Sequence, residues 1–293
     1  MFLLQRIEEM TDTCSDARRT IGEFILAHKE DLLDYSITDV ANAAYTSKAS
    51  VVRFAKSLGY EGWKDFRRDF LVELRKEQDF ASHIDVNYPF TKDDSGEEIT
   101  AKLAVVSAVS IEETRQMIDW AVMNRIVNLM QRADRIVIFA VSPNTFVCDL
   151  FRRKMLTIGK YVQVCQPKEQ GITVRSLTRS DFALIVSYSG NNPEIEPNRV
   201  VNFLKESRIP CAAITSAGQN YLHQSLENVL SISSHEHLYT KIGNFATEES
   251  LLYLLNILFA LYFQRNYERN MKRKISGSKT LEPERIETEP LEL

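Results

Sequence analysis

The stretch ITDVANAAYTSKASVVRFAK, residues 37–56, predicts two short helices joined by a sharp turn. Apolar residues recur at helical spacing on both sides of Tyr45 and Thr46, which interrupt the pattern. Ser47 or Thr46 can cap the second helix, because its side-chain oxygen can accept from an unpaired backbone N–H. The small Ala41 permits the close backbone approach that two steeply crossing helices need. The stretch therefore predicts a helix-turn-helix.

Short hydroxyls and cations project outward from the second of these helices. Such groups bind backbone phosphates and base edges in the major groove of DNA. The candidate DNA contacts are Thr46, Ser47, Lys48, Ser50, Arg53 and Lys56. The apolar pattern also occurs in structural helix pairs, so both interpretations stay open on the pattern, although it favours DNA binding. At Tyr45, Gly or Asn would suit a left-handed backbone better. The turn must therefore use another conformation or accept strain.

The sequence continues directly into a longer motif, SKASVVRFAKSLGYEGWKDFRRDF, at residues 47–70. This run resembles the N-terminal domain of RpiR-type transcription regulators, also called the MurR type. The resemblance rests on S-x-x-S-x-x-R-F at 47–54, L-G-Y at 58–60 and G-W-x-x-F at 62–66. The aromatic residues Trp63, Phe66 and Phe70 have helical spacing, which favours a core position over a stacking platform.

Composition is that of a soluble protein with two domains, each long enough to bury a core. The chain has 293 residues, 44% of them hydrophobic, and a formal net charge of −4. This charge argues against indiscriminate coating of nucleic acid but leaves room for a local basic face. No pair of the four cysteines has metal-ligand or C-x-x-C spacing, so we expect small buried thiols.

Nothing near the N-terminus predicts a signal peptide, because charged residues follow the first apolar ones at once. The longest apolar run near the C-terminus, residues 251–263, contains Asn256 and is too short to span a bilayer. We therefore expect a cytoplasmic protein without a membrane partner, and 251–263 is the candidate dimer interface.

From residue 99 the pattern changes to alternating helices and strands. A helix is predicted over 99–130, and the predicted strands are 135–141, 161–165, 182–188, 210–215 and 228–232. Helical patterns at 145–158, 193–207 and 219–226 separate them, and a long final helix covers 247–270. This alternation predicts an α/β domain: a doubly wound, parallel, five-stranded sheet in a three-layer sandwich.

The predicted organisation has four parts. An all-α helix-turn-helix domain covers 1–77, and its first 35 residues form one helix or two. A linker rich in turn-forming residues covers 78–98, the α/β domain covers 99–270, and a polar tail, expected to be disordered, covers 271–293.

The third predicted strand runs into the sequence IVSYSGNNPE at 185–194. Hydroxyls, a glycine and a helix start at the carboxyl end of a strand suit phosphate oxygens, although such turns also cap helices without binding anything. Residues 115–265 resemble the SIS (sugar isomerase) domain, whose S-x-S-G loop binds the phosphate of phosphosugars. The resemblance implies the ligands Ser187, Ser189, Gly190 and Asn192, the last where threonine is usual.

The end of the first predicted strand, AVSPN at 140–144, departs from the G-x-G-x-S turn usual in SIS domains. Both glycines are replaced, and Pro143 removes one N–H donor. Ser142 and Asn144 can still donate hydrogen bonds to a sugar. A pocket reshaped for another ligand and a loss of ligand binding are the alternatives.

SIS isomerases use an acid/base pair, and His235, His237, Glu248 and Glu249 are the available groups. A DNA-reading domain favours a sensor instead, so we expect no enzyme activity, catalytic residue, metal ligand or cofactor. The predicted protein is a regulator of carbohydrate metabolism that binds an operator in double-stranded DNA, senses a phosphorylated sugar and forms a homodimer or homotetramer. A SIS-domain sugar-phosphate isomerase and a ligand-blind repressor remain the alternatives.

Overall fold

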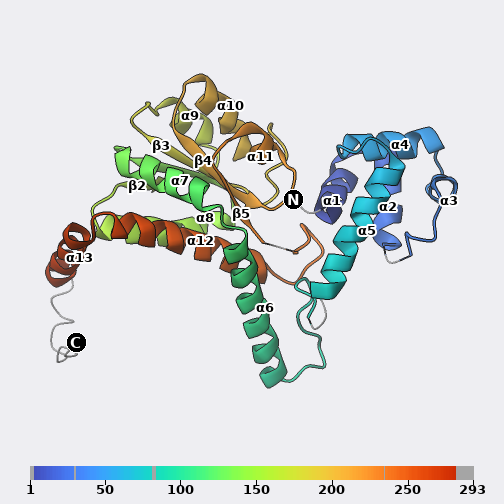
Figure 1. The fold of residues 1–293 in the computed structure, drawn as a ribbon, viewed down its shortest axis with the longest axis horizontal. Coiled ribbons are helices and arrows are strands. Elements are labelled where there is room, and N and C mark those ends of the chain that lie inside the picture. The colour runs from blue at the N-terminus through green and yellow to red at the C-terminus, as the bar shows by residue number, and fades with distance from the viewer. Residues whose placement is uncertain (1–2, 30, 81–83, 234, 282–293) are drawn as a thin grey trace. The chain divides into compact units, whose positions relative to one another are not determined.

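The computed structural model describes residues 3–29, 31–80, 84–233 and 235–281, and the chain forms two compact units (Figure 1). Unit 1 contains the described parts of 1–112 together with 216–219 and 233–247. Unit 2 contains 113–215, 220–232 and the described residues from 248 onward.

Five helices open unit 1. They are α1 (Leu3–Thr13), α2 (Ala17–Ala27), α3 (Ile37–Ala43), α4 (Lys48–Ser57) and α5 (Trp63–Phe80). Asp16 caps α2 by accepting from the N–H of Arg18, which divides the predicted first helical region into two helices. Trp63, Phe66 and Phe70 are at most 7% exposed and pack in the core of this helical bundle, which confirms their predicted role.

The rest of unit 1 is held by polar contacts at residues 84–95 and 235–247. Buried Asn87 accepts from the N–H of His237 at 2.6 Å and from that of Ile242 at 2.9 Å. The Glu8 carboxylate of α1 accepts from the N–H of Leu238 at 2.8 Å and lies 3.3 Å from a ring nitrogen of His237. The described residues of the predicted linker are therefore tied into unit 1.

The sheet of unit 2 confirms the predicted parallel five-stranded arrangement. Its strands are β1 (Ile136–Ala140), β2 (Val162–Val164), β3 (Phe182–Val186), β4 (Cys211–Ser216) and β5 (Val229–Ile232), in the order β2-β1-β3-β4-β5. β1 pairs in parallel with β2 and β3, and β3 with β4. Every residue of β1 and β3 is buried, as expected of strands covered on both faces.

Helices cover both faces of the sheet (Figure 1). On one face α7 (Trp120–Arg132), α8 (Asn144–Thr157) and α12 (Phe245–Gln264) pack against Ile136, Ile138 and Leu184. On the other face α9 (Gln170–Arg175), α10 (Val201–Glu206) and α11 (Tyr221–Ser225) pack against Val137, Phe139 and Ile185. Alternate residues of a strand thus face opposite helix layers, and the sheet between these layers completes the predicted three-layer sandwich.

Four elements differ from the sequence prediction. The helix predicted over 193–207 starts later than expected, because residues 193–197 form turns, Asn198–Val200 a 3₁₀ turn, and α10 begins only at Val201. The helix predicted over 99–130 is two helices, α6 (Gly96–Gln116) and α7, because Asp119 caps α7 by accepting from the N–H groups of Ala121 and Val122. Helix α9 was not predicted. The predicted final helix ends at Gln264, and α13 (Tyr267–Leu281) then runs through 271–281, where a disordered tail was expected. Residues 282–293 of that predicted tail lie outside the described residues.

Helix α12 is long and apolar enough to cross a membrane by length and composition alone, and 44% of its apolar window is buried inside the protein. Leu251, Leu254 and Leu258 are at most 1% exposed and belong to the sheet's core cluster. This packing is that of a core helix.

Candidate functional site

The turn between α3 and α4 is a Schellman motif built around a tyrosine. The N–H of Thr46 donates to the carbonyl of Ala41 at 2.8 Å, and that of Tyr45 to Asn42 at 3.1 Å. Tyr45 has a φ of +51°, so the turn accepts the strained left-handed conformation that glycine would adopt freely. The Tyr45 side chain is 98% exposed. No packing of the ring therefore offsets the strain.

Helix α4 presents the predicted DNA contacts on a preorganised polar face. Ser47 caps the helix by accepting from the N–H of Ser50 at 3.1 Å. The two serine hydroxyls lie 3.0 Å apart, and Arg53 Nη2 donates to Ser50 Oγ at 3.1 Å. Ser47, Lys48, Arg53 and Lys56 are exposed, and Thr46 and Ser50 are half-buried. Hydrogen bonds thus bring Ser47, Ser50 and Arg53 together, and Val51, Phe54 and Ala55 are buried and anchor the helix in the core.

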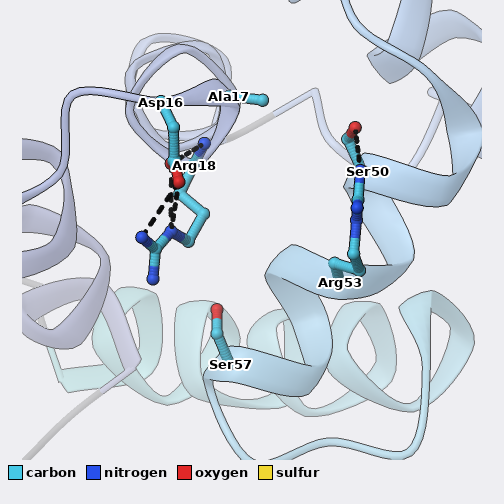
Figure 2. Close-up of a pocket in the computed structure, with 6 residues that line it drawn as sticks. All are labelled: Asp16, Ala17, Arg18, Ser50, Arg53 and Ser57. Carbon is cyan, nitrogen blue, oxygen red and sulfur yellow. Dashed lines mark hydrogen bonds and ion pairs between the residues drawn. The ribbon is translucent and has the colours of Figure 1, made fainter.

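A hollow of about 370 Å³ lies between α4 and the start of α2 (Figure 2). Ser50, Arg53 and Ser57 line it from α4, with the helical spacing i, i+3 and i+7. Asp16, Ala17 and Arg18 line it from α2, which the sequence analysis did not connect with DNA. Arg18 and Asp16 form an ion pair of 2.9 Å.

The predicted ligand residues of unit 2 lie at the point where the strand order reverses. Strand β1 lies between β2 and β3, so the chain leaves β1 on one side to form β2 and later returns to the other side to form β3. Ala140 and Val186, at the carboxyl ends of β1 and β3, pair with each other. Residues 141–144 and 187–190 follow these paired ends directly. The structure therefore brings the two predicted segments together where open α/β sheets bind ligands.

Within this crevice the candidate residues differ in exposure. Ser142 is exposed, whereas Asn144 is buried as the first residue of α8. Ser187 is buried, and its Oγ accepts from the N–H of Gly190 at 3.2 Å. Ser189 and Asn192 are half-buried, and Asn192 Oδ1 accepts from the N–H of Glu194 at 2.9 Å. The loop after β3 is thus closed by its own side chains.

Gly190 is required at the centre of this loop. Its φ is +61°, and a Cβ added there would lie 2.3 Å from Thr215 Oγ1 and 3.0 Å from Asn220 Nδ2. Thr215 Oγ1 in turn donates to the carbonyl of Tyr188 at 3.2 Å and accepts from Asn220 Nδ2 at 3.1 Å. The missing side chain therefore lets the loop lie directly on a buried polar pair.

The polar network extends from Asn220 to β5. Asn220 Oδ1 caps α11 by accepting from the N–H of His223 and lies 3.0 Å from His223 Nδ1. His223 Nε2 lies 3.0 Å from Ser231 Oγ. Burial lowers the pKa of His223 to about 4, so the ring is neutral near neutral pH. An acceptor at Nδ1 means that Nδ1 carries the hydrogen of this neutral ring.

Two buried amides also support the crevice and were missed by the sequence analysis. Gln170 is fully buried and donates from Nε2 to the carbonyl of Ala140 at 2.9 Å. Asn198, 1% exposed, donates from Nδ2 to the carbonyl of Asn192 at 3.0 Å. These partners lie 30 and 6 residues away along the chain. Hydrophobic periodicity carries no signal for either contact.

One of the candidate acid/base groups, His237, has a structural partner, and so does the neighbouring Glu236. The Glu236 carboxylate, fully buried, accepts from the N–H of Ala246 at 2.6 Å and the hydroxyl of Thr247 at 2.5 Å. His237 lies beside Glu8, and Lys241 lies 3.5 Å from Glu236. Glu248 is exposed and Glu249 half-buried in the first turn of α12, and His235 is half-buried.

Cysteine and metal chemistry have little support. All four cysteines are free, and burial raises the pKa of Cys148 to about 12 and that of Cys211 to about 11. Both are therefore thiols near neutral pH. Among the residues that the structure describes, no group of three or more His, Cys, Asp or Glu side chains is placed to hold a metal ion.

Comparisons with known proteins match both units. Residues 1–77 match the helix-turn-helix domain of the rpiR family, and residues 129–261 match the SIS domain. The chain is 24% identical over 285 residues to an uncharacterized HTH-type transcriptional regulator of Caldanaerobacter subterraneus, covering 97% of this chain and 98% of that protein.

Solved structures share the fold. The NanR protein of Vibrio vulnificus, complexed with ManNAc-6P, superposes with a TM-score of 0.61 at 23% identity, over 96% of this chain and 98% of that one. A putative sugar-phosphate isomerase of Listeria monocytogenes gives a TM-score of 0.55 at 12% identity, over 65% of this chain and 99% of that one. Because both domains match in order, and an HTH-type transcriptional regulator matches over 97% of the chain, the protein belongs to the RpiR family of helix-turn-helix transcriptional regulators with a C-terminal SIS domain.

Proposed function

We propose that the crevice between the ends of β1 and β3 binds a phosphorylated sugar, and that this ligand controls the binding of DNA by α4. The observation that carries the proposal is the loop at 187–190. Gly190 rests on the Thr215–Asn220 pair, and Ser187 and Ser189 supply hydroxyls at the same strand end. Hydroxyls and backbone N–H groups that converge in a loop suit phosphate oxygens.

The similarity to NanR supports the ligand class, because that protein was solved with ManNAc-6P, a phosphorylated sugar. The segment after β1 departs from the glycine-rich turn that is usual in SIS domains. Pro143 has no N–H, so Ser142 and Asn144 are the proposed donors to the sugar in place of a glycine-rich backbone. We therefore expect a sugar recognised more through side chains than through the backbone of this loop.

The DNA contacts proposed are Thr46, Ser47, Lys48, Ser50, Arg53 and Lys56. The protein acts in the cytoplasm. It acts as a dimer or tetramer, because one recognition helix reads too few base pairs for useful specificity. It acts without catalysis. This is supported by His237, a candidate acid/base group, whose ring nitrogen lies 3.3 Å from the Glu8 carboxylate instead of facing open solvent at a ligand site.

A thermal-shift screen of the purified chain against a panel of sugar phosphates tests the ligand proposal. Inorganic phosphate and the unphosphorylated sugars are included as controls, because only the intact sugar phosphate should bind tightly. Binding to the native state raises apparent stability by RT ln(1 + [L]/Kd), so a ligand at about 100 times its Kd adds about 2.7 kcal/mol.

Ser187→Ala should remove most of this ligand-induced shift, because Ser187 Oγ closes the loop at Gly190 and is a proposed phosphate ligand. Ser180→Ala is the matched control, since Ser180 is an exposed serine at the opposite, N-terminal end of β3. The shift of each variant is compared with and without ligand, so that a change in baseline stability cancels. A panel without any shift favours the ligand-blind repressor. Conversion of a sugar phosphate by the pure protein favours the isomerase.

A further inference from the structure

Arg18 is a second arginine beside the proposed DNA-reading helix, although it belongs to α2. It lines the same hollow as Arg53 and Ser50 (Figure 2). Its side chain is 45% exposed. The hollow between the two helices is therefore open to solvent, with one arginine on each side.

The guanidinium of Arg18 is held in place by Asp16. Nε donates to Oδ1 at 3.0 Å, Nη2 donates to Oδ2 at 2.9 Å, and the N–H of Arg18 donates to the same carboxylate at 2.9 Å. These bonds occupy one edge of the guanidinium. In the described part of the chain, Nη1 makes no hydrogen bond, so the outer edge of the planar group is available. Asp16 thus orients Arg18, as Ser50 orients Arg53.

The charges in the hollow suit a single anion. Arg18 and Arg53 contribute two positive charges and Asp16 one negative charge, while Ser50 and Ser57 add hydroxyl donors. A phosphodiester carries one negative charge and several acceptor oxygens. Oriented guanidinium groups bind such oxygens with defined geometry. Helices that flank a recognition helix commonly bind the DNA backbone rather than the bases.

We propose that a phosphodiester of the DNA backbone occupies the hollow between α2 and α4, and that Arg18 is a DNA contact from outside the helix-turn-helix. This inference rests on the proposed DNA surface of α4. Arg18 adds affinity and fixes the orientation of the domain on the duplex, whereas base recognition stays with α4.

The test is the salt dependence of binding to a mixed-sequence duplex, measured by fluorescence anisotropy on the full chain. Phosphate contacts are independent of sequence, so this probe needs no operator. Arg18→Ala should lower affinity roughly five- to tenfold near 100 mM salt. It should also reduce the slope of log K against log salt by about 0.9, the value for one lost phosphate contact. Arg18→Lys keeps the charge and should restore most of the slope.

Arg19→Ala is the matched control. Arg19 is the neighbouring residue on α2, is ion-paired with Glu23 at 2.8 Å, and does not line the hollow. Each alanine variant removes one cation and leaves one carboxylate unpaired, so a general charge effect would alter both slopes equally. Equal slopes for the two variants would overturn the proposal.

Arg53→Ala in the same assay separates this inference from the proposed function. If Arg53→Ala weakens binding while Arg18→Ala behaves like Arg19→Ala, only the role of Arg18 is wrong. If Arg53→Ala binds like the unaltered protein, the assigned DNA surface itself is wrong.

Discussion

Gly190 illustrates how one residue can set the shape of a ligand loop. Its backbone lies in the left-handed region, and the space where a side chain would stand is occupied by Thr215 and Asn220. The left-handed backbone disfavours any residue other than glycine. The crowding cannot be relieved by rotating a surface side chain, because Thr215 and Asn220 are buried.

Gly190→Ala should therefore destabilise the SIS domain by about 2–4 kcal/mol, from overpacking together with the left-handed backbone. Chemical denaturation followed by circular dichroism measures this. Gly171→Ala is the control, because nothing lies within 4 Å of the added Cβ and the site is helical. That variant should match or exceed the original stability. Equal losses in both variants would show that the crowding at Gly190 is unimportant.

Tyr45 is the opposite case, a residue that stays in a conformation suited to glycine. It occupies the C′ position of the Schellman motif after α3 with its ring almost wholly in solvent. Tyr45→Gly should raise the stability of the helical domain by about 0.5–1 kcal/mol, since the strain disappears and little burial is lost. Tyr45→Ala keeps the strain and should leave the stability near its original value. A gain of equal size in the alanine variant would contradict this account.

At the scale of elements, a hydrogen-bonded series connects β5 to the ligand loop. Ser231 contacts His223, His223 contacts Asn220, and Asn220 holds Thr215 beneath the loop. The neutral ring of His223 fits this series, because Nδ1–H donates to Asn220 and Nε2 accepts from Ser231. A protonated His223 ring would have no nitrogen left to accept a hydrogen bond from the Ser231 hydroxyl.

This network predicts a pH dependence of stability. The pKa of His223 is lowered to about 4 in the folded state, against about 6.5 when unfolded. Between about pH 4 and 6.5, His223 is therefore protonated in the unfolded chain but neutral in the folded protein. The free energy of unfolding falls as pH drops from about 6.5 to 4. After discounting for partial exposure, the loss is roughly 1–2 kcal/mol. Denaturation midpoints of the protein and of His223→Gln across this range measure it. Parallel profiles for the two would contradict the role of His223.

The elements show which features the sequence could predict. The apolar runs located all five strands. The signal is strongest for strands buried on both faces, such as β1 and β3. The break at Asp119 was missed because apolar residues keep their helical spacing on both sides of it. Helix α9 spans six residues, too few for periodicity to reveal. At Tyr45 the sequence left two alternatives open, another turn conformation or strain, and the φ of +51° is the strained one.

At the scale of the whole molecule, the candidate ligand segments were predictable because each follows a strand, and adjacent parallel strands end at the same edge of the sheet. The residues that support them were not. Thr215 reaches Tyr188 across 27 residues of chain, and Gln170 reaches Ala140 across 30. Such contacts exist only once the sheet is assembled. The assignment of Arg18 to the DNA surface likewise depends on the packing of α2 beside α4.

DNA binding is proposed for one unit and effector binding for the other, so the central claim is a coupling between the two sites. Effectors of this kind typically change affinity by 1–3 kcal/mol, or about 5–150-fold. The coupling is reciprocal, so DNA must change the affinity for the ligand by the same factor.

The most direct measurement is the affinity of the full chain for an operator recovered from genomic fragments, with and without the sugar phosphate found by thermal shift. We predict a change of at least about fivefold at a saturating ligand concentration. Ser187→Ala should lose this change but keep the DNA affinity measured without ligand. An operator affinity that the bound ligand leaves unaltered would contradict the central claim.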